Sequence, residues 1–127
     1  MNFTITTTIN AKDEAIYNAW LNSEQHSQMT GGEAIVSDKV GGTFSAWDGY
    51  IEGKNIELIP FNKIVQLWRT AEFKENEIDS TIELTLEETN GSTLITLVHS
   101  NLSEAGEQYI EGWKDNYFTP MAMYFNK

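Results

Sequence analysis

Cysteine is absent from this 127-residue chain, and proline and histidine occur only twice each. The absence of cysteine excludes a disulfide framework, thiolate chemistry and cysteine-ligated metal sites. Basic residues are also few, because 8 Lys and Arg stand against 19 Asp and Glu and give a formal net charge of -11. Phosphate backbones and anionic lipid surfaces repel such a chain, so nucleic acid and membrane surfaces are disfavoured as partners.

Long hydrophobic runs are missing as well. No stretch approaches the about 20 apolar residues that a membrane span needs, and the first residues lack the basic and apolar regions of a signal peptide. A cytoplasmic location is therefore expected. The length predicts a single domain over residues 1–127, which is long enough to bury a real core.

The last quarter of the chain, residues 103–126, has the pattern of one long amphipathic helix. Ser103 is the expected N-cap. Pro120 removes one backbone donor and crowds the preceding turn, so it predicts a kink or a break into two pieces. The apolar stripe of this helix holds Tyr109, Ile110, Trp113, Tyr117, Met121 and Tyr124.

The first third predicts one strand and two short helices. Residues 2–9 alternate between apolar and polar, which is typical of a strand covered on one side. Asn10, with an acidic residue three positions on, is expected to cap the first helix. Asn22 and Gln25 repeat this pattern for the second helix, which the glycine pair at 31–32 ends.

From residue 33 to residue 101 the sequence predicts consecutive antiparallel strands. The dipeptide Asp48-Gly49 is a hairpin signal that would pair Ala46 with Ile51. Gly53 indicates a bulge or a bend inside a strand. Residues 64–69 are apolar on both faces, so this strand is either central or covered by a second subunit.

The clearest hairpin turns at Asn90-Gly91. With that turn as centre, Leu86 faces Ile95, Leu84 faces Leu97, and Ile82 faces His99. These side chains point to the core and place His99 inside, while the alternate threonines and glutamates meet water. The expected fold is α+β: a curved antiparallel sheet of about seven strands, two short helices after the first strand, and a long C-terminal helix across the sheet.

Four blocks of the sequence resemble a known family: residues 26–34 (HSQMTGGEA), 41–53 (GGTFSAWDGYIEG), 63–69 (KIVQLWR) and 111–118 (EGWKDNYF). The chain resembles the START-like or SRPBCC superfamily with its helix-grip fold, and within it the C-terminal domain of the homologues of the activator of heat-shock protein 90 ATPase. The resemblance implies a cavity between helix and sheet, no shared catalytic motif and a chaperone as a possible partner. Other branches of this superfamily bind lipids or hormones, or act as aromatases and cyclases.

The predicted cavity lining combines large aromatic and adaptable apolar side chains with two polar groups. His99 could contact a ligand or move a proton, or it could be tied to backbone groups at the start of the last helix. Arg69 could anchor an anionic head group, or form an outward salt bridge. His26 is expected on the surface. The candidate ligand-binding residues are Trp20, Met29, Trp47, Tyr50, Trp68, Arg69, Phe73, His99, Trp113, Tyr117 and Met121.

Three functions follow as hypotheses. The first is binding of a small hydrophobic or aromatic ligand beneath the last helix by a monomer or a homodimer. The second is a co-chaperone-like interaction module, and the third is an enzyme of the cyclase or dehydratase kind, for which only His99 or Arg69 could serve. No metal-ligand spacing and no phosphate-loop context occur, so neither a metal nor a cofactor is expected and catalysis is not favoured.

Overall fold

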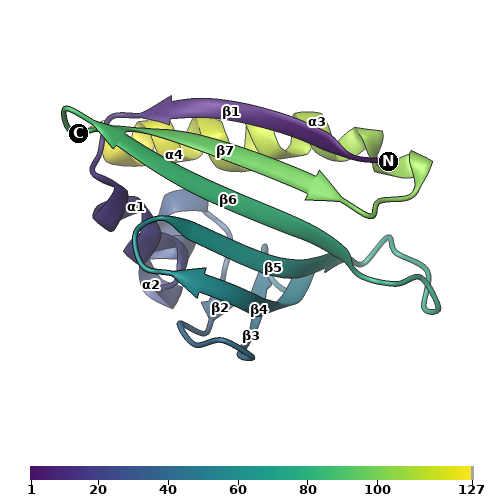
Figure 1. Cartoon of the computed structure of the whole chain (residues 1–127). Helices are drawn as coiled ribbons and strands as arrows, with labels where there is room; N and C mark the ends of the chain where they lie inside the picture. Colours follow the sequence, from purple (N-terminus) through teal and green to yellow (C-terminus); the bar gives the residue numbers. More distant parts are fainter. Residues whose placement is uncertain (127) are drawn as a thin grey trace.

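The computed structural model describes residues 1–126 and has the predicted α+β architecture (Figure 1). Seven strands form one antiparallel sheet in the order β1-β7-β6-β5-β4-β3-β2. The sheet elements and the first two helices are β1 (Phe3–Ile9), α1 (Asp13–Trp20), α2 (Ser23–Thr30), β2 (Ile35–Val36), β3 (Thr43–Ala46), β4 (Ile51–Ile59), β5 (Lys63–Thr70), β6 (Ser80–Thr89) and β7 (Ser92–Ser100). The strand that is apolar on both faces, β5, is central in this order, which is one of the two positions that its sequence predicted.

The hairpin between β6 and β7 has the register that its turn dictates. Asn90 and Gly91 both have positive φ, of 54° and 84°, as a primed two-residue turn demands. The pairs Leu86–Ile95, Leu84–Leu97 and Ile82–His99 all form. These six side chains are at most 2% exposed, which confirms that this face of the hairpin lies in the core.

The turn between β3 and β4 also has its predicted register, because Ala46 pairs with Ile51. Its backbone is unusual. Trp47, Asp48 and Gly49 have φ angles of 52°, 58° and 89°, so three consecutive residues are left-handed. This conformation is ordinary for glycine and uncommon for a bulky residue, so Trp47 is held here against its backbone preference.

Gly53 lies inside β4 but is not the bulge that its position suggested. The register of β4 against β5 shifts between Asn55 and Glu57 instead. A Cβ atom on Gly53 would lie 1.9 Å from the carbonyl oxygen of Leu67 and 2.7 Å from the ring of Phe44. Glycine is therefore required here for the close approach of β5 and of an aromatic ring.

Of the three residues predicted to cap helices, one makes its cap bond. The Asn22 side chain accepts a hydrogen bond of 2.9 Å from the backbone N–H of Gln25, and Gly31 ends the helix at φ 91°. The prediction for Asn10 was wrong, since α1 begins only at Asp13 and its N-cap residue, Lys12, makes no side-chain cap. Asn10 instead accepts a hydrogen bond from the hydroxyl of Ser92.

The last quarter is helical but not one continuous α-helix. It consists of a 3-10 turn η1 (Glu104–Glu107), α3 (Gln108–Trp113), a π-helical turn η2 (Lys114–Phe118) and α4 (Thr119–Phe125). Ser103 occupies the N-cap position without a side-chain cap bond. The predicted break at Pro120 takes the form of the π turn, in which the N–H of Thr119 bonds the carbonyl of Lys114.

The apolar stripe survives this irregularity. Tyr109, Trp113, Tyr117 and Met121 are at most 9% exposed, and the last quarter lies alongside β1 and β7 in Figure 1. Helix α2 packs against α4 and α1 packs against β6, so the helices enclose the core together with the sheet. No helix within residues 1–126 is both long and apolar enough to cross a membrane.

Asn22 and Asn10 give a matched test of this part of the fold. Replacing Asn22 by Ala should lower the free energy of unfolding by about 1 kcal/mol, because an orphan amide of α2 loses its partner. Replacing Asn10 by Ala should change it by less than about 0.5 kcal/mol, because no helix N-terminus depends on it. Urea denaturation of both variants measures the difference, and equal losses would contradict the assignment of the caps.

Candidate functional site

A hollow of about 420 Å³ lies between the last quarter on one side and β4, β5 and the turn between β3 and β4 on the other. This volume is in the range of small-molecule sites. Six aromatic side chains line it: Trp47, Tyr50, Trp68, Tyr109, Trp113 and Tyr117. The remaining lining residues are Ile51, Gln108, Gly112 and Asn116. Because Tyr50, Gln108 and Asn116 are exposed, the hollow opens to solvent at their side.

The structure brings five of the eleven predicted ligand-binding residues to this hollow, namely Trp47, Tyr50, Trp68, Trp113 and Tyr117. Trp20, Met29, His99 and Met121 are buried in the core without lining it, and Phe73 packs against that core. Tyr109 is the main residue that the prediction missed. Its place in the apolar stripe, one turn before Trp113, was the signal that could have found it.

The aromatic wall is itself tightly packed. The rings of Trp68 and Trp113 lie 5.5 Å apart, and the ring of Tyr109 meets Trp68 edge-on at 5.0 Å. Tyr117 continues the wall, with its ring 4.9 Å from Trp113, and Trp20 supports it from behind at 5.0 Å. Such contacts stabilise a wall beyond the area that they bury, so these rings hold a fixed shape.

Polar groups at the rim are bonded to one another. The hydroxyl of Tyr109 lies 2.6 Å from the hydroxyl of Thr70 and 3.5 Å from a carboxylate oxygen of Glu72. The hydroxyl of Tyr50 donates to the same oxygen at 3.0 Å. Burial raises the pKa of Tyr109 to about 12, so this phenol stays neutral.

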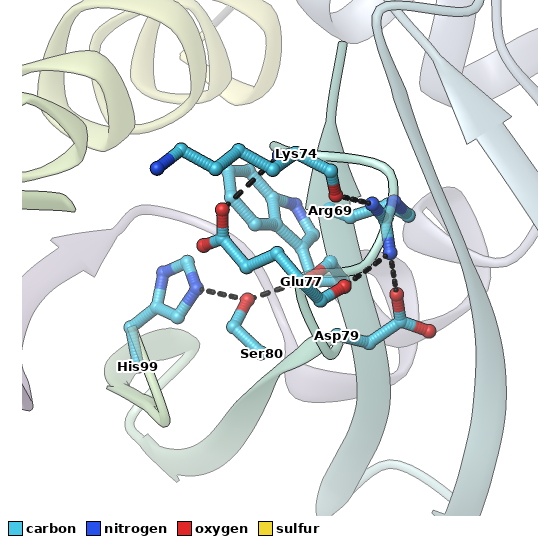
Figure 2. A network of polar contacts seen from close by, with 7 residues as sticks. Arg69, Lys74, Glu77, Asp79, Ser80 and His99 are labelled. Carbon is cyan, nitrogen blue, oxygen red and sulfur yellow. Dashed lines mark hydrogen bonds and ion pairs between the residues drawn. The ribbon is translucent and has the colours of Figure 1, made fainter. Parts of the chain in front are cut away.

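His99 is fully buried, as predicted, but its partners are side chains and not backbone groups at the start of the last helix. The indole N–H of Trp113 donates to Nδ1 of His99 at 3.0 Å, and Nε2 lies 2.9 Å from the hydroxyl of Ser80. That hydroxyl donates to the carbonyl of Trp68 at 2.6 Å (Figure 2). Since the indole is only a donor, Nδ1 is unprotonated and the proton of the neutral ring is on Nε2.

This arrangement also determines the charge of His99. Burial lowers its pKa to about 3, and a proton on Nδ1 would face the Trp113 donor. The imidazole is therefore neutral at physiological pH. Its two hydrogen bonds join the last quarter to β6.

The expectation that His26 lies on the surface was wrong, because it is only 2% exposed. Its Nδ1 donates to the carbonyl of Trp20 at 2.8 Å, and Nε2 accepts from the hydroxyl of Tyr117 at 3.0 Å. Burial lowers its pKa, while the backbone bond opposes that shift. The polar neighbours in sequence hid a buried helix face that His26 shares with Met29 and Thr30, at spacings of three and four.

Arg69 is on the other face of the sheet and does not line the hollow. Of the two predicted alternatives, the outward salt bridge is present, with Nη1 2.7 Å from Asp79. The guanidinium also donates to the carbonyls of Glu77 and Lys74, at 3.0 and 2.9 Å (Figure 2). It thereby ties down the loop between β5 and β6, which carries Glu72 at the rim of the hollow.

Within the described residues 1–126, no group of three His, Asp or Glu side chains could hold a metal ion. The aromatic hollow and its bonded rim are the candidate site of this part of the chain.

Known proteins resemble the chain over nearly its whole length. The profile of the family described as Activator of Hsp90 ATPase homolog 1-like protein matches residues 10–126. The human Activator of 90 kDa heat shock protein ATPase homolog 1 is 28% identical over 116 residues, which is 91% of this chain and 34% of that protein. The homologue from Dictyostelium discoideum is 29% identical over 103 residues, 79% of this chain and 26% of that protein. The chain thus spans about a third or less of the length of these two relatives.

Solved structures agree with the fold. A crystal structure described as an HSP90 activator from Plasmodium falciparum has a TM-score of 0.88 and 26% identity, and the match covers 99% of this chain and 96% of that one. The Aha1 dimer from Colwellia psychrerythraea has a TM-score of 0.78 and 19% identity, with 99% and 94% covered. At 19% identity, the structure from Colwellia psychrerythraea supports the helix-grip fold alone.

The neutral, buried His99 makes stability depend on pH. Between about pH 6.5 and pH 3 the unfolded chain binds a proton at this residue that the native protein does not, so native stability falls as the pH is lowered. From pH 6.5 to pH 5 this histidine alone should cost about 1.6 kcal/mol of unfolding free energy. Urea denaturation at both pH values measures the loss. In NMR spectra of the native protein the His99 ring resonances should stay constant over this interval, and a midpoint near pH 6.5 would contradict the assignment.

Proposed function

The chain belongs to the family of Activator of Hsp90 ATPase homolog 1-like proteins, and we propose that within this family it binds a small hydrophobic or aromatic molecule in the hollow beneath its last quarter. The observation that carries the proposal is the hollow itself. About 420 Å³ remains open between elements that are otherwise closely packed, and six aromatic side chains line it. A lining of this kind, with few polar groups, is typical of sites for small organic ligands.

We propose binding without catalysis. The cyclase or dehydratase hypothesis required His99 or Arg69 at the ligand, and neither lines the hollow. His99 has both ring nitrogens bonded and a pKa of about 3, so it is a poor proton carrier near neutral pH. Arg69 is bonded on the opposite face of the sheet. The cytoplasmic location and the choice between monomer and homodimer stay predictions.

Gly112 allows a sharp test of the binding site, because it lines the hollow from α3. The atom nearest to a Cβ at this position would be Nδ2 of Asn116, at 3.9 Å. Replacing Gly112 by Leu should therefore fill the hollow without disturbing the core. We expect the affinity for the neutral aromatic dye N-phenyl-1-naphthylamine to fall by about tenfold or more, as expected when a pocket wall is blocked. The quenching of Trp47, Trp68 and Trp113, which all line the hollow, measures binding.

Gly112→Ala is the matched control. It should keep the dye affinity and raise the free energy of unfolding by roughly 0.5–1 kcal/mol, since alanine is the better residue inside a helix. Equal dye binding by the Leu variant and the unmodified protein would place binding elsewhere. The absence of any thermal shift across a library of apolar and aromatic compounds would overturn the proposed function, since a ligand at a hundred times its Kd adds about 2.7 kcal/mol.

A second candidate function is a co-chaperone-like interaction with a heat-shock protein of the 90 kDa class. The relatives favour it, because the human and Plasmodium falciparum proteins are both described as activators of that chaperone or its ATPase. The shared region is the one that this chain spans, so an interaction in this part of the relatives would be available to it.

The chaperone candidate predicts that this protein raises the ATP turnover of the 90 kDa heat-shock protein from the same organism, with saturation as its concentration increases. The Gly112→Leu variant separates the two functions, because it fills the hollow and leaves the outer faces of the sheet and helices unchanged. Stimulation that persists in this variant would assign the chaperone contact to an outer surface. Unchanged ATP turnover at saturating protein, together with no co-purification of the two proteins, would exclude the candidate.

A further inference from the structure

We propose that the occupant of the hollow is an organic cation with a methylated or quaternary ammonium group, which the aromatic rings hold through cation–π attraction. This inference deepens the proposed function and rests on it, since it assumes that the hollow takes a ligand. Three observations carry it: four of the six lining rings have their polar atoms bonded within the protein, none of the ten lining residues is charged, and the rim carries a carboxylate.

The three rings that the last quarter contributes to the wall have their polar atoms engaged with the protein. The indole N–H of Trp113 is bonded to His99, and the hydroxyl of Tyr117 to His26. The hydroxyl of Tyr109 lies against Thr70 at 2.6 Å. These three side chains therefore offer a ligand their ring surfaces, and few hydrogen bonds.

Trp47, on the opposite side of the hollow, also offers a ligand no hydrogen bond, but for a different reason. Its Nε1 atom is buried and has no hydrogen-bond partner among residues 1–126. Because that atom is closed off from solvent, the part of the indole that borders the open hollow is its carbon framework. A ligand that relies on donated hydrogen bonds, such as a carboxylate or a phosphate, finds none from this ring.

The charges around the hollow indicate which kind of ligand its aromatic rings would favour. None of the ten lining residues is basic or acidic, so an anion lacks a counter-charge. The nearest charged group bonded to the lining is the carboxylate of Glu72, which contacts the hydroxyls of Tyr50 and Tyr109. The net charge of -11 attracts cations over a longer range. Aromatic rings that surround a desolvated ammonium group are a known solution for this chemistry, and six rings exceed what such a cage needs.

Three probes of one shape isolate the charge. Choline is the cation, 3,3-dimethylbutan-1-ol is its uncharged isostere, and 3,3-dimethylbutanoate is the anionic counterpart. Titrations followed by the indole N–H and ring resonances of the protein should give a dissociation constant for choline that is about tenfold or more below that of the alcohol. The carboxylate should bind more weakly than either. Added salt should weaken choline and leave the alcohol unchanged, because only the charged probe is screened.

Two rim variants test the source of the preference. Tyr50→Leu should weaken choline by roughly two- to fivefold, while Tyr50→Phe, which keeps the ring, should retain its affinity. Glu72→Gln should weaken choline about two- to fivefold without affecting the alcohol. Tyr50 is 38% exposed, so the leucine variant is compatible with the fold.

The possible outcomes separate this inference from the proposed function. If the alcohol binds as tightly as choline, the hollow is an apolar site and the preference for cations is wrong. If choline does not shift the resonances of the lining residues at all, the inference is overturned, and the apolar library with the Gly112→Leu variant decides separately whether the hollow binds anything. A choline affinity that Tyr50→Leu and Glu72→Gln both leave unchanged would also overturn it.

Discussion

The hydrogen bond from the Trp113 indole to His99 fixes how the last quarter lies on the sheet. It is buried, it joins α3 to β7, and it continues through Ser80 to the carbonyl of Trp68 in β5. A buried donor or acceptor left without its partner would cost about 1–3 kcal/mol, so the helix cannot rotate or slide without a substantial loss. The positions of the three rings that the last quarter contributes to the wall, Tyr109, Trp113 and Tyr117, depend on this constraint.

The two histidines serve the same purpose with opposite tautomers. His99 accepts at Nδ1 because its partner is an indole N–H, and His26 donates from Nδ1 because its partner is a carbonyl. One histidine holds Trp113 and the other holds Tyr117, which are neighbours in the wall. The imidazoles are thus fixed supports behind the aromatic surface.

The sequence predicted the features that depend on local chemistry. Asn90-Gly91 determined the register of β6 and β7, because only a few residues adopt such a turn, and the apolar stripe identified the face of the last quarter that is buried. Pro120 predicted a kink or break but not its form, because a missing amide does not determine whether the helix bends, stops or forms a π turn. The burial of His26 depends on a bond to Tyr117, which lies 91 residues further along the chain. The outward position of Arg69 was one of two predicted alternatives, and it follows from strand alternation once Trp68 faces the hollow.

At the left-handed turn, the backbone conformation of Trp47 and the packing of its side chain act against each other. Three consecutive positive φ angles suit glycine or asparagine, and a bulky residue there costs about 1 kcal/mol or more in backbone strain. Replacing Trp47 by glycine would relieve this strain but would also remove a ring that packs against the core and lines the hollow. The packing of that ring therefore holds the backbone of the turn in a conformation that the residue itself disfavours.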